Sequence, residues 1–268
     1  MIRFLNVLML LCIMSLPVAA QQAPLTRLDT SDQGRNWDAV GRIDVNGRGF
    51  CTGTLIAPDL VLTAAHCLYD SDTGQPFALS EMEFLSGWRN GRATAYRTIR
   101  SALSHPDYEY SAQLTVDRVR TDIALLQLQH PIINTRIIPF PTETRPRAHS
   151  RIGVVSYARD RTEAPSLQET CEVLDQQGGI MVMSCEVDHG ASGAPVFAVK
   201  DGIVRVVSVV SAMAERGGSR VALAAQLDAP LREMQRQFAV RALIGSSGAS
   251  LFSSGQRRDI GAKFQSPE

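Results

Sequence analysis

The sequence predicts an all-β protein, built as two packed barrels or as a sandwich, with one helix near its C-terminus. Short apolar runs separated by Gly, Pro, Asn and Asp follow one another from Trp37 onward, and their lengths favour strands over helices. Lys200-Asp201-Gly202 is typical of a hairpin turn, because Gly tolerates the positive φ that such turns require. Strands are expected at residues 37–45, 50–56, 60–65, 82–88, 123–128, 151–158, 180–185, 195–199 and 203–210. Many short strands without a solenoid repeat are typical of barrels and sandwiches.

The predicted helix follows the last strand. Asp228 suits its N-cap position and Pro230 its first turn. Leu231, Met234 and Phe238 recur at spacings of three and four residues, which places them on one helical face.

The N-terminus has the pattern of a signal peptide. Arg3 precedes an almost wholly apolar run, and Ala19-Ala20 supplies the small residues of a cleavage site, so residues 1–20 are expected to be removed. The run is shorter than the roughly 20 residues of a membrane span, which favours a signal over an anchor. We therefore expect a secreted or periplasmic protein that has no membrane contact once the signal is removed.

The rest of the chain divides into three expected parts. Residues 21–35 are polar and are expected to form a leader or propeptide-like segment. Residues 36–244 form the predicted domain, and residues 245–268, rich in Gly and Ser at their start, are expected to be a flexible tail. Charge is balanced, with 27 Lys and Arg against 27 Asp and Glu, and no basic stripe interleaves with aromatics. This composition argues against nucleic acid as a partner and does not indicate an oligomeric state.

The cysteines point to disulfides. Cys51, Cys67, Cys171 and Cys185 remain after the signal is removed, and four cysteines allow three pairings. Pairing 51 with 67 and 171 with 185 closes two short loops, each within one half of the chain. Neither a CxxC motif nor a suitable His spacing suggests zinc, so an exported chain favours bridges over metal.

Ser192 is the candidate nucleophile. A serine hydroxyl reacts only when a base takes its proton and N–H groups hold the developing oxyanion. Gly190 and Gly193 flank Ser192 and allow a sharp turn, in which the N–H groups of Gly190 and Ser192 are the expected donors. A plain Gly-rich turn before a strand is the alternative for this segment.

His66 and Asp122 are the candidate partners of this serine. His66 ends an apolar run beside Cys67, a place where a structural histidine is the alternative. Asp122 begins an apolar strand, where burial of a carboxylate is costly without a hydrogen-bonded partner. An imidazole N–H is such a partner, and the carboxylate then fixes the tautomer needed for base catalysis. A solvated strand start is the alternative for Asp122.

Three segments together resemble trypsin-like serine peptidases. They are Leu62-Thr63-Ala64-Ala65-His66-Cys67, Asp122-Ile123-Ala124-Leu125-Leu126 and Gly190-Ala191-Ser192-Gly193-Ala194-Pro195. The resemblance extends from about Trp37 to Phe238. It implies the chymotrypsin-like fold of two packed six-stranded antiparallel β-barrels with a catalytic cleft between them. It also implies an endopeptidase that acts on proteins or peptides without a cofactor, with Ser192 as nucleophile, His66 as base and Asp122 as orienter.

The resemblance assigns further residues. Cys51–Cys67 matches the family's disulfide beside the catalytic histidine, and Ser211 matches the serine that hydrogen-bonds near the catalytic aspartate. The substrate cleft is expected to include Glu186, His189, Ser211 and Met213. In this family, the residue six positions before the nucleophile lies at the bottom of the pocket that binds the substrate side chain. That residue is Glu186 here, and a buried carboxylate at this position favours Arg or Lys substrates.

Two departures resemble the bacterial, glutamyl endopeptidase-like branch of the family. Ala191 replaces the Asp that precedes the nucleophile in animal enzymes, and no Ile-Val-Gly-Gly-like terminus is present. Val210 stands where that branch has a histidine for acidic side chains, so glutamate specificity is not supported. Because Ala191 offers no charge to a freed N-terminal ammonium, activity is expected not to depend on one exact N-terminus.

Other functions and one metal site are weaker alternatives. A catalytically silent binding protein of the same fold usually lacks a triad residue, whereas this chain has all three. An esterase could use the same triad. Asp70-Ser71-Asp72-Thr73-Gly74 has the spacing of a calcium loop, but a polar surface turn is favoured, and no metal is expected.

Overall fold

The computed structural model describes residues 23–144 and 146–250. The expected signal peptide and the tail beyond residue 250 lie outside the described residues. Among the residues that are described, no helix is long and apolar enough to cross a membrane.

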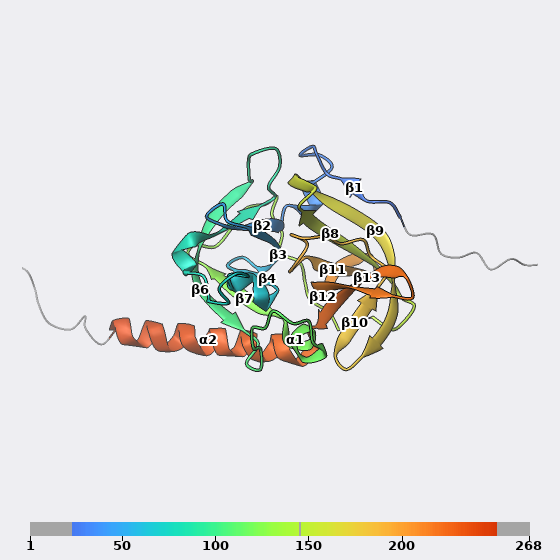
Figure 1. Ribbon diagram of the computed structural model, residues 1–268. Coiled ribbons are helices and arrows are strands. Elements are labelled where there is room, and N and C mark those ends of the chain that lie inside the picture. Colours follow the sequence, from blue (N-terminus) through green and yellow to red (C-terminus); the bar gives the residue numbers. More distant parts are fainter. Residues whose placement is uncertain (1–22, 145, 251–268) are drawn as a thin grey trace, which may run out of the picture.

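The first half of the chain forms a closed six-stranded barrel (Figure 1). Its strands are β2 (Val40–Val45), β3 (Phe50–Ala57), β4 (Leu60–Thr63), β5 (Met82–Ser86), β6 (Ala95–Ser104) and β7 (Ala124–Leu128), in the order β2-β3-β4-β7-β6-β5. Ile43, Leu55 and Phe84, each fully buried, fill its interior from three of these strands. Their burial gives the barrel a core of its own.

The second half, joined by β1 from the N-terminal segment, forms a seven-stranded sheet beside the barrel (Figure 1). Its strands are β1 (Thr26–Arg27), β8 (Arg151–Ala158), β9 (Arg161–Gln177), β10 (Ile180–Met183), β11 (Pro195–Lys200), β12 (Ile203–Arg216) and β13 (Ser219–Gln226). The order is β1-β9-β10-β13-β12-β11-β8, and β8 also pairs with β9, so the strands β8 to β13 close on themselves. The predicted all-β, chymotrypsin-like architecture is confirmed, with β1 as an addition at the edge.

The expected strands all occur, but β1, β6, β9 and β13 were not predicted. In β6 only Ile99 is buried, and β9 carries many polar residues along its length, so neither has the apolar run used as the signal. The β11–β12 hairpin turn forms as predicted, with Asp201 and Gly202 at φ of 54° and 75°. Short helical turns fill the connections: η1 (Arg35–Trp37), η2 (Ala65–Leu68), η3 (Leu79–Glu81) and α1 (Val116–Thr121).

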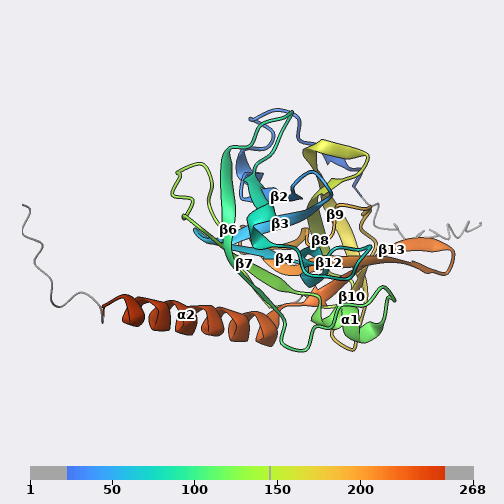
Figure 2. The same ribbon diagram turned by 60° about the vertical axis from the view of Figure 1, so that its left-hand side comes forward.

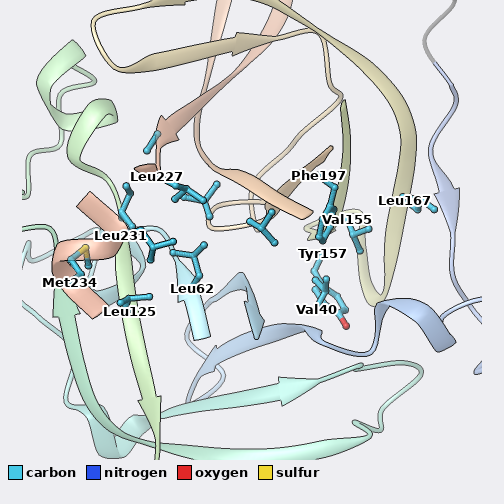
Figure 3. Close-up of a cluster of buried hydrophobic side chains, with 14 of the residues drawn as sticks. Val40, Leu62, Leu125, Val155, Tyr157, Leu167, Phe197, Leu227, Leu231 and Met234 are labelled. Carbon is cyan, nitrogen blue, oxygen red and sulfur yellow. The ribbon is translucent and has the colours of Figure 1, made fainter. Parts of the chain in front are cut away.

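The predicted C-terminal helix is α2 (Asp228–Ser250). Leu231, Met234 and Phe238 are buried, as their spacing predicts. They join a cluster that also contains Leu62 of the first barrel and Phe197 of the second, so this cluster connects the two barrels (Figure 3). The helix continues six residues into the segment expected as a tail, because each added residue extends the hydrogen-bonded ladder. Its C-terminal part projects beyond the barrels (Figures 1 and 2).

The segment expected as a leader packs against the second barrel, beside the domain predicted to start at residue 36. Thr26 and Arg27 pair with β9, the Leu28 N–H donates to Pro165 O at 2.9 Å, and the Leu28 side chain is buried in the cluster between the barrels. Backbone pairing and one buried side chain hold this segment. Backbone pairing and a single buried residue do not produce an apolar pattern in the sequence, so the sequence did not predict this packing.

Arg89 ties the N-terminal segment to the first barrel. Its guanidinium Nη1 contacts Asp38 Oδ1 at 2.7 Å, and the two side chains are 8% and 2% exposed. Arg89 Nε donates to Leu28 O at 3.0 Å, and Nη2 donates to Gly34 O at 3.1 Å. The buried charges are thus paired, and the remaining donors reach backbone carbonyls of the segment.

Replacement of Arg89 by Met is expected to lower the free energy of unfolding by about 3–5 kcal/mol, because it leaves the Asp38 carboxylate buried without its partner. Chemical denaturation measures this change. Arg35→Met is the matched control: the Arg35–Asp32 pair is 65% and 86% exposed, so its loss should cost at most about 1 kcal/mol. Equal effects of the two substitutions would contradict the role given to Arg89.

Candidate active site

A cavity of about 710 Å³ lies where the nucleophile turn of the second barrel meets the first barrel. His66, His189, Gly190 and Ser192 are among its lining residues. The structure therefore brings the predicted base and the predicted nucleophile to one cavity, from positions far apart in the sequence.

His66 is held by Asp122. His66 lies in η2, directly after β4, and Asp122 lies between α1 and β7. The His66 Nδ1 atom is 2.7 Å from Asp122 Oδ2, and the His66 backbone N–H donates to Asp122 Oδ1 at 2.8 Å. An ionised carboxylate can only accept, so in the neutral imidazole the proton is on Nδ1 and Nε2 is left as an acceptor. The arrangement suits a general base.

The Asp122 carboxylate is fully buried but well satisfied. Besides its two bonds from His66, it accepts a hydrogen bond from Ser211 Oγ at 2.5 Å. Ser211 lies at an irregularity of β12, where the register shifts between Val210 and Ala212. Three donors compensate the burial of the charge. The side chain of His66 is 18% exposed, so its other edge remains accessible.

Ser192 lies in a tight turn that needs glycine on both sides. Gly190 and Gly193 have φ of 97° and 76°, which L side chains rarely adopt. A Cβ on Gly193 would lie 2.1 Å from Thr63 Oγ1. The turn is closed by the Ala191 N–H, which donates to Asp188 O at 2.9 Å.

The two amides expected to hold an oxyanion are free within the described chain. Neither the Gly190 N–H nor the Ser192 N–H donates to an acceptor among the described residues. Both residues line the cavity that holds His66. These amides could therefore bind an oxygen of a substrate carbonyl as it gains charge.

The residues expected in the substrate cleft separate into different places. His189 lines the cavity of Ser192, whereas Glu186 and Met213 line a second cavity of about 530 Å³. The expected preference for Arg or Lys depended on a buried carboxylate at Glu186. In the structure Glu186 is exposed, so it does not provide one. The reason is the path of the loop: Cys185 is bonded to Cys171, and the Glu186 N–H donates to Gln168 Oε1 at 2.8 Å.

Gln168 is a contact residue that sequence reasoning missed. Its side chain is fully buried, its Oε1 receives the Glu186 N–H, and its Nε2 donates to Ala23 O at 3.0 Å. It thus joins the N-terminal segment to the loop that leads to Ser192. A glutamine within a polar strand gives no sequence signal for such a role.

The remaining predictions concern bridges and metals. The disulfides are Cys51–Cys67 and Cys171–Cys185, the pairing that closes two short loops. The Asp70 segment is a polar turn, in which Asp70 Oδ1 accepts from the Thr73 and Asp72 N–H groups, and these bonds lower the pKa of the Asp70 carboxyl. Cys51, His66 and Cys67 have donor atoms within 4.8 Å of one another, but the two sulfurs are bonded and offer no thiolate.

The chain is similar to known proteins in both sequence and fold. The sequence model of the trypsin family matches residues 29–228. The chain is 25% identical over 150 residues to the glutamyl endopeptidase of Bacillus licheniformis, an alignment that covers 56% of this chain and 45% of that protein. The chain thus spans less than half the length of this relative. A solved structure of Glu endopeptidase in complex with MPD superposes with a TM-score of 0.65 at 17% identity, covering 83% of this chain and 99% of that one, a likeness of fold.

Proposed function

The chain belongs to the trypsin family, and we propose that it is an exported serine endopeptidase that uses Ser192, His66 and Asp122. The observation that carries the proposal is the contact of His66 Nδ1 with the buried Asp122 carboxylate at 2.7 Å, beside a cavity that Ser192 shares. This contact leaves His66 Nε2 as the acceptor of a proton.

The proposed reaction is acyl transfer. His66 Nε2 takes the proton from Ser192 Oγ, which attacks a peptide carbonyl carbon and forms a tetrahedral intermediate. The Gly190 and Ser192 N–H groups bind the oxyanion of this intermediate. His66 then gives its proton to the leaving amine, and water attacks the acyl-enzyme with His66 again as base. Asp122 stabilises the imidazolium in both steps.

Export is the second part of the proposal. Two disulfides support it, because disulfides persist in oxidising compartments and are rare in the cytosol. The expected signal peptide at residues 1–20 adds to this support. The proposed location is therefore extracellular or periplasmic.

A library of peptides with varied residues before the scissile bond tests the activity. We expect cleavage of internal bonds, and no strong preference for Arg or Lys at this position, because Glu186 is exposed. Cleavage only after Arg or Lys would contradict this interpretation of Glu186. Hydrolysis of simple esters without any peptide cleavage would favour an esterase, and no turnover of either would favour a binding protein.

A further inference from the structure

Thr52 lies where the first barrel contacts the turn that carries Ser192. It is part of β3, it is fully buried, and it follows Cys51 of the disulfide beside His66. We infer that Thr52 is a positioning residue that holds this turn in the shape that binds an oxyanion. The inference rests on the proposed function.

The hydroxyl of Thr52 connects two segments of the second barrel. Thr52 Oγ1 donates to Gly190 O at 2.9 Å and accepts from the Tyr157 N–H at 3.1 Å. A backbone N–H can only donate and a carbonyl can only accept, so the direction of both bonds is fixed. The single hydroxyl proton therefore belongs to the bond with Gly190.

The backbone of Thr52 holds the same turn from its other side. Its N–H donates to Ser192 O at 2.9 Å, and its carbonyl accepts from Thr63 Oγ1, also at 2.9 Å. Thr52 thus binds the carbonyls of Gly190 and of Ser192, the two residues whose N–H groups are the proposed oxyanion donors. Fixing each carbonyl restricts rotation of the backbone that carries the donors.

The Gly190–Ala191 peptide is held from two sides: the Ala191 N–H donates to Asp188 O at 2.9 Å, and Thr52 Oγ1 binds the Gly190 carbonyl. Glycine has wide conformational freedom, and Gly190 adopts a φ of 97°. The neighbouring Ala191 is fully buried, and its methyl side chain cannot add a hydrogen bond or an ion pair to those of the backbone. The bond from Thr52 Oγ1 fixes the Gly190–Ala191 peptide, which lies between the two donor amides. Without it, this peptide loses one of its two hydrogen bonds, and the distance of the donor amides from the developing charge is less tightly set.

The test compares Thr52→Val with Thr52→Ser, and uses Thr54→Val as a matched control. Thr54 is also fully buried, two residues further along β3, but within the described part of the chain its Oγ1 bonds to nothing except Ala39 O, at 3.5 Å. Thr52→Val keeps the side-chain volume and removes the hydroxyl. Turnover of a cleaved library peptide and the rate of serine labelling by a fluorophosphonate are measured below the unfolding temperature of every variant.

Thr52→Val is expected to lower kcat by about 100-fold with KM changed less than about threefold, since misplaced donors act on the transition state. Thr52→Ser should recover kcat to within a few-fold, and Thr54→Val should stay near wild type even if it unfolds at a lower temperature. Should valine prevent folding, Thr52→Ala gives the same comparison.

The outcomes separate this inference from the proposed function. Equal kcat for Thr52→Val and Thr54→Val, in a wild-type protein that is labelled and active, would overturn the role of Thr52 while leaving the enzyme assignment intact. Failure of Thr52→Ser to recover activity would also overturn it, because the hydroxyl would then not be the responsible group. Absence of labelling and turnover in the wild type would instead reject the proposed function.

Discussion

Replacement of Ser192 by Ala is expected to lower kcat by about a millionfold and to leave the fold intact, as removal of the nucleophile does in a related triad. Ser192 supplies the atom that would form the acyl-enzyme, and no other group at the turn can take its place. Its side chain is partly exposed in the cavity, so the loss of one hydroxyl should not disturb the core.

Turnover of a cleaved library peptide measures the effect, with circular dichroism as the check on folding. Ser101→Ala is the control: Ser101 lies on β6 and its Oγ donates to Gln127, away from the cavity. Its kcat should match the wild type. Retention of more than a few per cent of activity by Ser192→Ala, in a preparation free of other peptidases, would show that Ser192 is not the nucleophile.

Replacement of Asp122 by Asn is expected to lower kcat by about 10⁴-fold, the effect of the same change in a related triad. Asp122 accepts hydrogen bonds from the His66 backbone, from His66 Nδ1 and from Ser211 Oγ. An amide has one acceptor oxygen, so with three donors to satisfy, its NH₂ group must face one of them. If the NH₂ group faces Nδ1, the proton moves to Nε2 and His66 can no longer act as the base.

The measurement is kcat of Asp122→Asn at neutral pH, compared with Asp117→Asn. Asp117 lies on α1, only five residues away, and its carboxylate is 81% exposed in a surface pair with Arg120. That control should behave like the wild type. A loss of less than about tenfold in Asp122→Asn would mean that the buried carboxylate does not set the tautomer of His66.

The sequence was most informative where a function depends on neighbours along the chain. The residues beside His66, Asp122 and Ser192 each form a short motif, and the structure brings His66 to Asp122 and to the cavity of Ser192. Apolar runs predicted strands that are buried over most of their length, such as β7 and β8. The spacing of Leu231, Met234 and Phe238 predicted that they share one face of α2, and all three are buried.

The sequence was least informative where a role depends on contacts between distant segments. Thr52 acts on Gly190 across a separation of 138 residues, which no local pattern indicates. Gln168 joins Ala23 to Glu186 in the same way. Glu186 was assigned by counting back from Ser192, a method that fails when a bridge such as Cys171–Cys185 changes the path of the loop.

The N-terminal segment also shows how packing can differ from composition. Thr26 and Arg27 are polar and exposed, yet they pair with β9, and only Leu28 is buried. The hypothesis that activity does not depend on one exact N-terminus stays a prediction for residues added in front of Ala23. Removal of residues up to 31, however, is expected to cost stability, because it takes away Leu28 and the acceptors of Arg89 and Gln168.

Labelling with a fluorophosphonate tests the central claim most directly, because this reagent reacts with a serine only when a base activates it. The mature protein is treated with reagent in excess, digested, and mapped by mass spectrometry, with His66→Ala treated in parallel. We predict one label per chain, on Ser192, and its near-complete loss in His66→Ala. A label on another serine, or equal labelling of Ser192 without His66, would contradict the account.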